Sequence, residues 1–182
     1  MRRRPLLRLL EAYLLRYPEE SEVTDRFVSF VNDHEDCFER HLAVGHITGS
    51  AWIVSEDGGE TLLTHHAKLD IWVQPGGHAD GDPDVLAVAM REAEEETGLL
   101  SLTPEREEIF DLDVHRIPAR KNEPGHDHFD VRFLLRQSGD RSYRVSEESH
   151  DLAWVPLGEI ERFSREESIL RMRDKTAGFL RR

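Results

Sequence analysis

The chain has 182 residues, of which 38% are hydrophobic and 34% are charged. This composition is enough for one folded domain with a buried core and excludes a wholly disordered chain. The 37 acidic residues outnumber the 24 basic ones, and the formal net charge is −13. Nucleic acid is therefore not expected as a main partner, because a phosphate backbone would be repelled.

The cysteine content and the hydropathy of the chain indicate a compartment. Cys37 is the single cysteine, so an intramolecular disulfide is excluded and a reducing environment is favoured. The basic start at residues 1–4 is followed by an apolar stretch that charged residues interrupt, which is not typical of a signal peptide. No uncharged run is long enough to span a bilayer. We expect a cytoplasmic protein without a membrane partner.

Two helices are predicted at the start of the chain. Apolar residues recur at helical spacing over residues 6–17, and Pro18 ends that pattern. A second helix is predicted from Ser21, a candidate N-cap residue. We interpret residues 1–42 as a helical extension and residues 43–182 as the main domain. The extension is a candidate for a homodimer contact or for a lid, and no residue decides between the two.

Strand patterns follow the two helices. Residues 47–55 and 61–65 read as a hairpin around the turn formers at 56–60, and residues 71–73 read as a short strand that runs into a predicted turn at 74–77. Further strands are predicted at 109–117, 129–135 and 152–155, and a closing helix at 166–180. Trp52, Trp72 and Trp154 are expected to pack in the core. The chain is thus predicted to have an α/β (α+β) fold with a mixed sheet.

The helix predicted at residues 83–97 carries the chemistry. Glu92, Glu95 and Glu96 share one side of it at spacings of three and four residues. Three converging carboxylates repel one another unless a cation lies among them, and oxygen ligands suit Mg²⁺ or Mn²⁺. Taken alone, this spacing is more typical of a solvated acidic face. However, Gly76 and Gly77 precede the helix, where an unhindered backbone can offer a carbonyl to a metal ion.

The sequence around this helix resembles the signature of the Nudix hydrolase family. The second half of that signature is Arg-Glu-apolar-x-Glu-Glu-x-Gly-apolar, and residues 91–99 match it completely as Arg-Glu-Ala-Glu-Glu-Glu-Thr-Gly-Leu. Counting back places the leading glycine of the signature at Gly77. The position of its first glutamate is taken by Pro83, which is the one departure. The signature covers residues 77–99, and the order of strands and helices is similar over most of the chain after His46.

The resemblance implies a Nudix-like α/β/α sandwich and a metal-dependent hydrolase that cleaves the diphosphate linkage of a small nucleoside-diphosphate derivative. It implies that Glu95 and Glu96 bind Mg²⁺ or Mn²⁺ together with the Gly77 carbonyl. Glu92 would be the general base or a further metal ligand. Arg91 would orient Glu92 by a charge-assisted hydrogen bond. Arg91, Glu92 and Glu95 are accordingly the expected catalytic residues.

Pro83 leaves two alternatives open. Asp82 and Asp84 flank it, and either is a candidate for the missing carboxylate; we expect activity to survive the replacement. If activity does not survive, the same fold would serve as a ligand-binding or regulatory module. A further alternative is an isomerase or another non-hydrolytic enzyme that binds a diphosphate.

Histidines outside the signature are candidate substrate-binding residues. His126, His128 and Asp130 alternate along a predicted strand and therefore face one side of it. They are candidates for an added metal or phosphate site, and a polar sheet face is the plainer interpretation. His66 and His78 lie before and after the glycine pair and are candidates for contacts with the substrate's phosphates.

A carboxylate from a loop outside the signature is also expected to complete the metal site. The candidates are Glu123, Glu147 and Glu148, and the sequence does not choose among them. Glu123 is in addition a candidate substrate-binding residue beside the histidines.

Overall fold

The computed structural model describes residues 2–119 and 124–181. Two helices come first, α1 (Arg4–Arg16) and α2 (Ser21–Asp33), with the short 3-10 helix η1 (Pro18–Glu20) between them. The strands that follow are β1 (Gly45–Val54), β2 (Glu60–His66), β3 (Ile71–Val73) and β4 (Gly76–His78). Helix α3 (Val85–Thr97) leads to β5 (Leu102–Pro104), β6 (Asp111–Ile117), β7 (His126–Gln137) and β8 (Ser149–Pro156). The 3-10 helix η2 (Leu157–Arg162) and helix α4 (Glu167–Leu180) close the chain.

Within the described part of the chain, the eight strands form one mixed sheet with β1 near its middle. Strand β1 is antiparallel to β2 and β4 and parallel to β7, with which it is paired along its whole length from Gly45↔Asp127 to Val54↔Arg136. Strands β5 and β6 pair with β7, whereas β3 and β8 pair with β2. The predicted mixed sheet is therefore confirmed.

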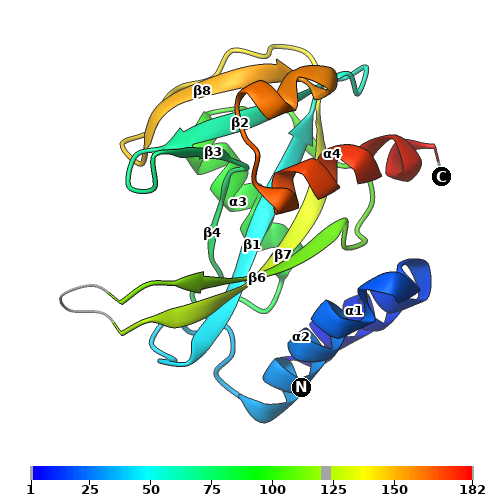
Figure 1. The fold of residues 1–182 in the computed structure, drawn as a ribbon, viewed down its shortest axis with the longest axis vertical. Helices are drawn as coiled ribbons and strands as arrows, with labels where there is room; N and C mark the ends of the chain where they lie inside the picture. Colours follow the sequence, from blue (N-terminus) through cyan, green and yellow to red (C-terminus); the bar gives the residue numbers. More distant parts are fainter. Residues whose placement is uncertain (1, 120–123, 182) are drawn as a thin grey trace.

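Helices cover both faces of the sheet (Figure 1). Successive residues of β1 point to opposite faces, and all of them are buried. Ile53 belongs to the core that contains the buried residues of α1, α2 and α3, whereas Trp52 and Val54 belong to the core under α4. A strand buried on both sides in this way lies in the middle layer of an α/β/α sandwich, as expected.

Two local predictions were wrong. The pair Gly76 and Gly77 lies in strand β4, opposite Ser50 and Gly49 of β1, and does not form a turn. A Cβ atom on Gly76 would collide with the Ser50 side chain. A glycine at this position therefore allows β4 to lie close to β1. Ser21 is the first residue of α2 and not its N-cap; Glu20 precedes the helix, without a side-chain cap.

Other predictions from the sequence agree with the structure to within a few residues. Trp52 is fully buried, whereas Trp72 and Trp154 are half-buried and pack against the core that contains α4 and against the core that contains α3, respectively. Strand β5 was not predicted. Across the residues that the structure describes, no helix has the length and apolar character needed to cross a membrane.

Candidate metal and substrate site

The start of α3 is built by the residues around Pro83. Asp84 precedes the helix, and its Oδ1 accepts a hydrogen bond from the Ala87 amide at 3.1 Å, as an N-cap residue does. Asp82 Oδ1 accepts a hydrogen bond from the Asp84 amide at 2.9 Å. Both aspartates flanking Pro83 therefore have a carboxylate oxygen engaged in ordering the first turn of α3.

The face of α3 that packs on β1 is also the face that carries Glu92 and Glu96 to the neighbouring strand β4. Val88 and Ala89 are fully buried, and a Cβ atom on Gly49 of β1 would lie only 2.9 Å from the Val85 carbonyl oxygen. This close helix–strand approach fixes the rotation of α3. The helix ends at Gly98, which has a φ of +71°, a conformation that favours glycine.

Further along the same face, α3 brings two carboxylates onto the backbone of β4. The Gly76 amide donates a hydrogen bond to Glu96 Oε1 at 3.0 Å. The Glu92 carboxylate lies so close to Gly77 that a Cβ atom there would collide with its Oε2. Glu95 is exposed on the same helix. The two glycines thus give carboxylate side chains room that any other residue would fill.

Burial and mutual repulsion make these carboxylates difficult to ionise. Burial raises the pKa of Glu96 to about 7, the charges of Glu148 and Glu92 add to the rise, and the Gly76 amide opposes it. The pKa of Glu92 is also raised, mainly by burial, with Glu95 and Glu148 adding to the effect and Arg91 opposing it. A divalent cation among these oxygens would offset both effects. Hard oxygen donors of this kind fit Mg²⁺ or Mn²⁺.

Arg91 links Glu92 to strand β4. Its Nη2 atom donates a hydrogen bond to Glu92 Oε1 at 2.8 Å and another to the His78 carbonyl oxygen at 3.1 Å. The first hydrogen bond holds the carboxylate in one orientation. The second ties that orientation to the strand that carries Gly77.

The structure distinguishes among the three candidate loop carboxylates. Glu148 is close enough to Glu92 and Glu96 to raise the pKa of both, and it is anchored through its carbonyl oxygen, which accepts a hydrogen bond from the Ala67 amide at 2.9 Å. Glu147 is exposed beside it. Glu123 lies outside the described residues. Glu148 is thus the loop carboxylate that the fold brings to the glutamates of α3.

The candidate histidines fall into two places. His66 lies at the end of β2, where its Nδ1 accepts a hydrogen bond from the Lys68 amide at 3.2 Å. Ala67 follows it, so His66 adjoins the Glu148 side of the site. His78, at the end of β4, lies close to His126 and His128, at the start of β7; these two strands pair with β1 on either side. His126 Nε2 and His128 Nε2 are 3.2 Å apart.

His46 joins these histidines and was not predicted from the sequence. It is the second residue of β1, directly opposite His128 in the parallel pairing with β7, and it is 1% exposed. The signal was the polar alternation at residues 46, 48 and 50, which matches the alternation at residues 126–132. That match has meaning only when β1 and β7 are known to be neighbours.

A buried polar network lies next along the same two strands. Asp130 Oδ1 accepts hydrogen bonds from Thr48 Oγ1 at 2.8 Å and Ser50 Oγ at 2.7 Å, and its Oδ2 accepts one from Arg132 Nε at 2.7 Å. Arg132 is 3% exposed and also pairs with Asp111 at 3.1 Å. The charges in this network are compensated, so it holds β1, β6 and β7 in register.

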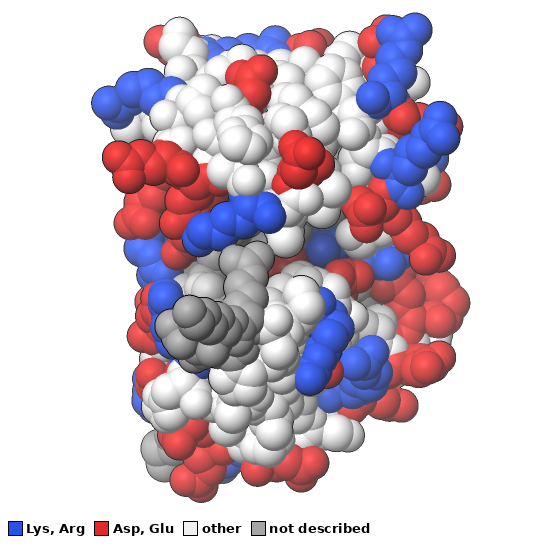
Figure 2. All heavy atoms as spheres, turned by 60° about the vertical axis from the view of Figure 1, so that its left-hand side comes forward, with Lys and Arg blue, Asp and Glu red and all other residues white. Residues whose placement is uncertain are grey.

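One face of the molecule carries much negative charge. Figure 2 shows the molecule from the side that lies to the left in Figure 1. A hollow crosses the middle of this face, and acidic side chains gather along its right-hand rim with basic side chains at intervals. An anionic ligand would meet repulsion on such a face unless cations neutralised it locally.

Comparisons with solved structures show the same fold. The chain is similar to a Caenorhabditis elegans Ap4A hydrolase in a binary complex, with 20% identity, a TM-score of 0.61 and coverage of 74% of this chain and 97% of the other. It is similar to a NUDIX family hydrolase from Clostridium perfringens, with 22% identity, a TM-score of 0.53 and coverage of 72% and 96%.

A third solved structure is the NUDIX domain of Shewanella oneidensis NrtR complexed with ADP ribose. It has 17% identity, a TM-score of 0.52 and coverage of 74% of this chain and 87% of the other. At these identities the similarity shows the fold alone. No match was found among the curated protein sequences that were compared.

The family is shown by the sequence itself. The family model described as NUDIX domain matches residues 45–175, which is most of the chain and includes every strand of the sheet, α3 and the carboxylates gathered on β4. The chain therefore belongs to the NUDIX domain family, as a hydrolase that acts on pyrophosphate bonds.

Proposed function

We propose that the protein is a divalent-metal-dependent hydrolase that cleaves the diphosphate linkage of a small nucleoside-diphosphate derivative. The observation that carries this proposal is the contact of two carboxylates with glycine backbone. Glu96 accepts a hydrogen bond from the Gly76 amide, and the Glu92 carboxylate lies against Gly77. Both carboxylates have a raised pKa. Ionising both carboxylates costs free energy when no cation is present, and a bound cation offsets that cost.

Mg²⁺ or Mn²⁺ is the proposed cofactor. Glu95, Glu96 and the Gly77 carbonyl would be its ligands, with Glu92 adjacent and Glu148 as the ligand from outside the helix. When bound, such ions supply positive charge that stabilises the phosphoryl oxygens and makes the attacking water more acidic.

The protein's own residues would position and deprotonate the water. We assign to Glu92 the role of general base or further ligand, because burial raises its pKa toward the working range of a base. Arg91 fixes the Glu92 carboxylate through its 2.8 Å hydrogen bond. Arg91 would thus act as a positioning residue.

The substrate class rests on two arguments. The similar solved structures include an Ap4A hydrolase and a NUDIX domain complexed with ADP ribose, which supports a nucleotide-derived substrate for this chain too. His66, His78, His126 and His128, from strands β2, β4 and β7, are the proposed neighbours of the substrate. We also propose that residues 1–42 are an extension of the NUDIX domain, because the family match begins at residue 45.

A substrate panel tests the proposal. The protein is incubated with Mg²⁺ and with NAD-like compounds, nucleotide sugars, dinucleoside polyphosphates and nucleoside triphosphates, and the products are separated by chromatography. We expect turnover of at least one class and a loss of at least about 100-fold in kcat for the double variant Glu95→Gln, Glu96→Gln.

The matched control is Glu94→Gln, an exposed glutamate on the same helix. This variant should keep the wild-type rate. Undiminished turnover by the double variant would contradict the assigned metal site. Tight binding of a nucleotide without any turnover would support the ligand-binding alternative.

A further inference from the structure

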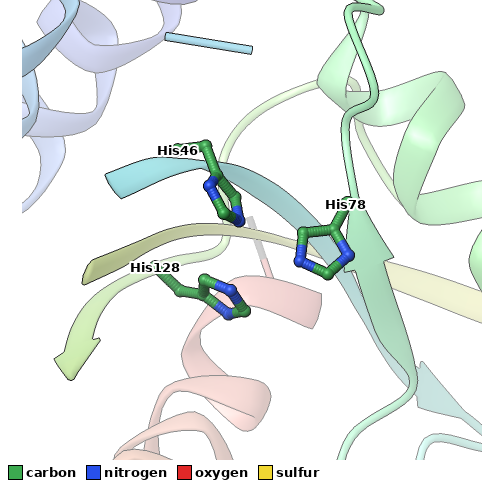
Figure 3. A group of neighbouring side chains, drawn as sticks. All are labelled: His46, His78 and His128. Carbon is green, nitrogen blue, oxygen red and sulfur yellow. The ribbon is translucent and has the colours of Figure 1, made fainter. Parts of the chain in front are cut away.

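Three histidines that are distant in the sequence point toward one centre (Figure 3). His46 comes from β1, His78 from β4 and His128 from β7. One imidazole nitrogen from each lies within 4.8 Å of the other two. Sheet pairing fixes this convergence, because His46 is opposite His128 and Thr48 is opposite His78.

His46 lacks hydrogen-bond partners. Its side chain is buried, and within residues 2–119 and 124–181 neither Nδ1 nor Nε2 has a hydrogen-bond partner. Burying a polar ring nitrogen without a partner costs free energy, and a neutral imidazole always carries both a donor and an acceptor nitrogen. A buried side chain of this kind that faces other imidazoles indicates a ligand bound between them.

His126 is placed like the outer partner or fourth ligand of a metal centre. Its Nδ1 lies 3.0 Å from the Pro124 carbonyl oxygen, so Nδ1 carries the proton and Nε2 keeps its lone pair. His126 Nε2 lies 3.2 Å from His128 Nε2 and accepts a hydrogen bond from it, which a bound ion would replace. Two nitrogen ligands of a tetrahedral zinc ion are roughly 3.3 Å apart. This pair of imidazoles already has the spacing of metal ligands.

The imidazoles are held in the form that binds metal ions. Burial and the neighbouring histidines lower the pKa of His46 to about 4 and that of His128 to about 2. Both rings are therefore neutral near pH 7, which metal ligation requires.

We propose that His46, His78 and His128, with His126 beside them, bind a transition-metal ion of the zinc type. All donors are imidazole nitrogens, which favour Zn²⁺ and its neighbours over Mg²⁺. Closing the three rings around an ion requires movements on the order of 1 Å. This centre differs in ligands from the glutamate site on α3, and it does not depend on the proposed hydrolytic function.

A bound ion would join three strands next to the glutamates. His78 follows Gly77 directly, and its carbonyl oxygen accepts the hydrogen bond from Arg91. The ion would therefore fix the end of β4 against β1 and β7 and support the backbone on which Glu92 lies. Binding to the folded state alone also raises stability.

Metal titration of the full chain, without an added histidine tag, tests the site. The protein is stripped with a chelator and titrated with Zn²⁺, and separately with Co²⁺ as a visible-absorption probe, in a large excess of Mg²⁺. We expect one tightly bound equivalent of Zn²⁺, a Co²⁺ spectrum typical of nitrogen ligands and a higher unfolding temperature. Absence of a Zn²⁺ equivalent that resists Mg²⁺ would overturn the proposal.

Variants locate the ion. His78→Gln is at a half-buried position that should tolerate the change, and we expect at least about tenfold weaker Zn²⁺ binding; His46→Gln should behave alike. The exposed His41→Gln is the control and should bind normally. The double variant Glu95→Gln, Glu96→Gln should retain the Zn²⁺ equivalent, which separates this site from the glutamates. Unchanged affinity in both His46→Gln and His78→Gln would refute the assignment.

Discussion

The amide of Gly76 donates its hydrogen bond to Oε1 of Glu96 at 3.0 Å, which joins strand β4 to helix α3 through a carboxylate that the fold disfavours in its charged form. The pKa of this carboxylate is about 7 in the folded chain against an ordinary value of 4.5. Stability that depends on the protonated form is therefore complete below about pH 4.5 and is lost as the pH rises through 7.

Substituting Glu96 should reveal this loss. We expect metal-free Glu96→Gln to be more stable than the wild type at pH 8, by on the order of 1 to 2 kcal/mol, and to differ much less at pH 5. Urea unfolding at the two pH values measures the difference. Adding Mg²⁺ should stabilise the wild type more than the variant. Equal stabilisation at both pH values would contradict the assignment of the raised pKa to Glu96.

Gly77→Ala should impair the reaction more than the fold. The added Cβ atom would collide with Glu92 Oε2, so the carboxylate would have to leave its present position, where Arg91 donates a hydrogen bond to it. We expect kcat to fall about 10- to 100-fold, with a small change in the unfolding midpoint. Gly158→Ala is the control, because a Cβ atom there has no heavy atom within 4 Å. A Gly77→Ala enzyme with the wild-type rate would argue against the position assigned to Glu92.

Asp84→Ala tests what the residues around Pro83 do. The Asp84 side chain caps α3, so its removal should cost about 1 kcal/mol of unfolding free energy. If that is its whole role, kcat at saturating Mg²⁺ should stay within about threefold of the wild-type rate. A large loss of activity, restored by Pro83→Glu, would instead show that Asp84 supplies the carboxylate missing from the family signature.

Asp111→Ala should be one of the most destabilising single changes. Asp111 is fully buried and pairs with Arg132 at 3.1 Å, Arg171 at 2.8 Å and Lys175 at 2.7 Å. Removing it takes one fully buried carboxylate from a network of three cations, which costs about 3 to 5 kcal/mol. Denaturant unfolding measures this loss. The exposed Asp174→Ala should change stability by less than about 0.5 kcal/mol, and a similar effect of the two changes would be inconsistent with a structural network.

The sequence predicted most of the fold because its patterns are local. Helix α3 was recognisable from its periodicity and from Gly98 at its end, although it begins at Val85 and Pro83 lies before its N-cap instead of in its first turn. The α/β class followed from the order of elements. Strand β4 was mistaken for a turn because the reason for its glycines is the nearby Ser50 side chain and Glu92 carboxylate. These contacts are not visible along the chain.

The same limit applies to the site. The glutamates of α3 could be found because one helix carries them at fixed spacing. Glu148 could not be chosen over Glu147, because the choice depends on how the loop before β8 lies over α3. His46 was missed because the histidines whose rings it contacts come from β4 and β7. Which strands are neighbours in a sheet cannot be inferred from one sequence.

The parallel pairing of β1 with β7 has a consequence for the synthesis of the protein. The Thr48–Asp130 hydrogen bond joins residues 82 positions apart, so the middle of the sheet cannot assemble until most of the chain has left the ribosome. Until then β1, every residue of which is buried in the folded protein, has an open edge. We therefore expect slow folding dominated by non-local contacts, and nascent chains that end before β7 should depend on chaperones to avoid aggregation.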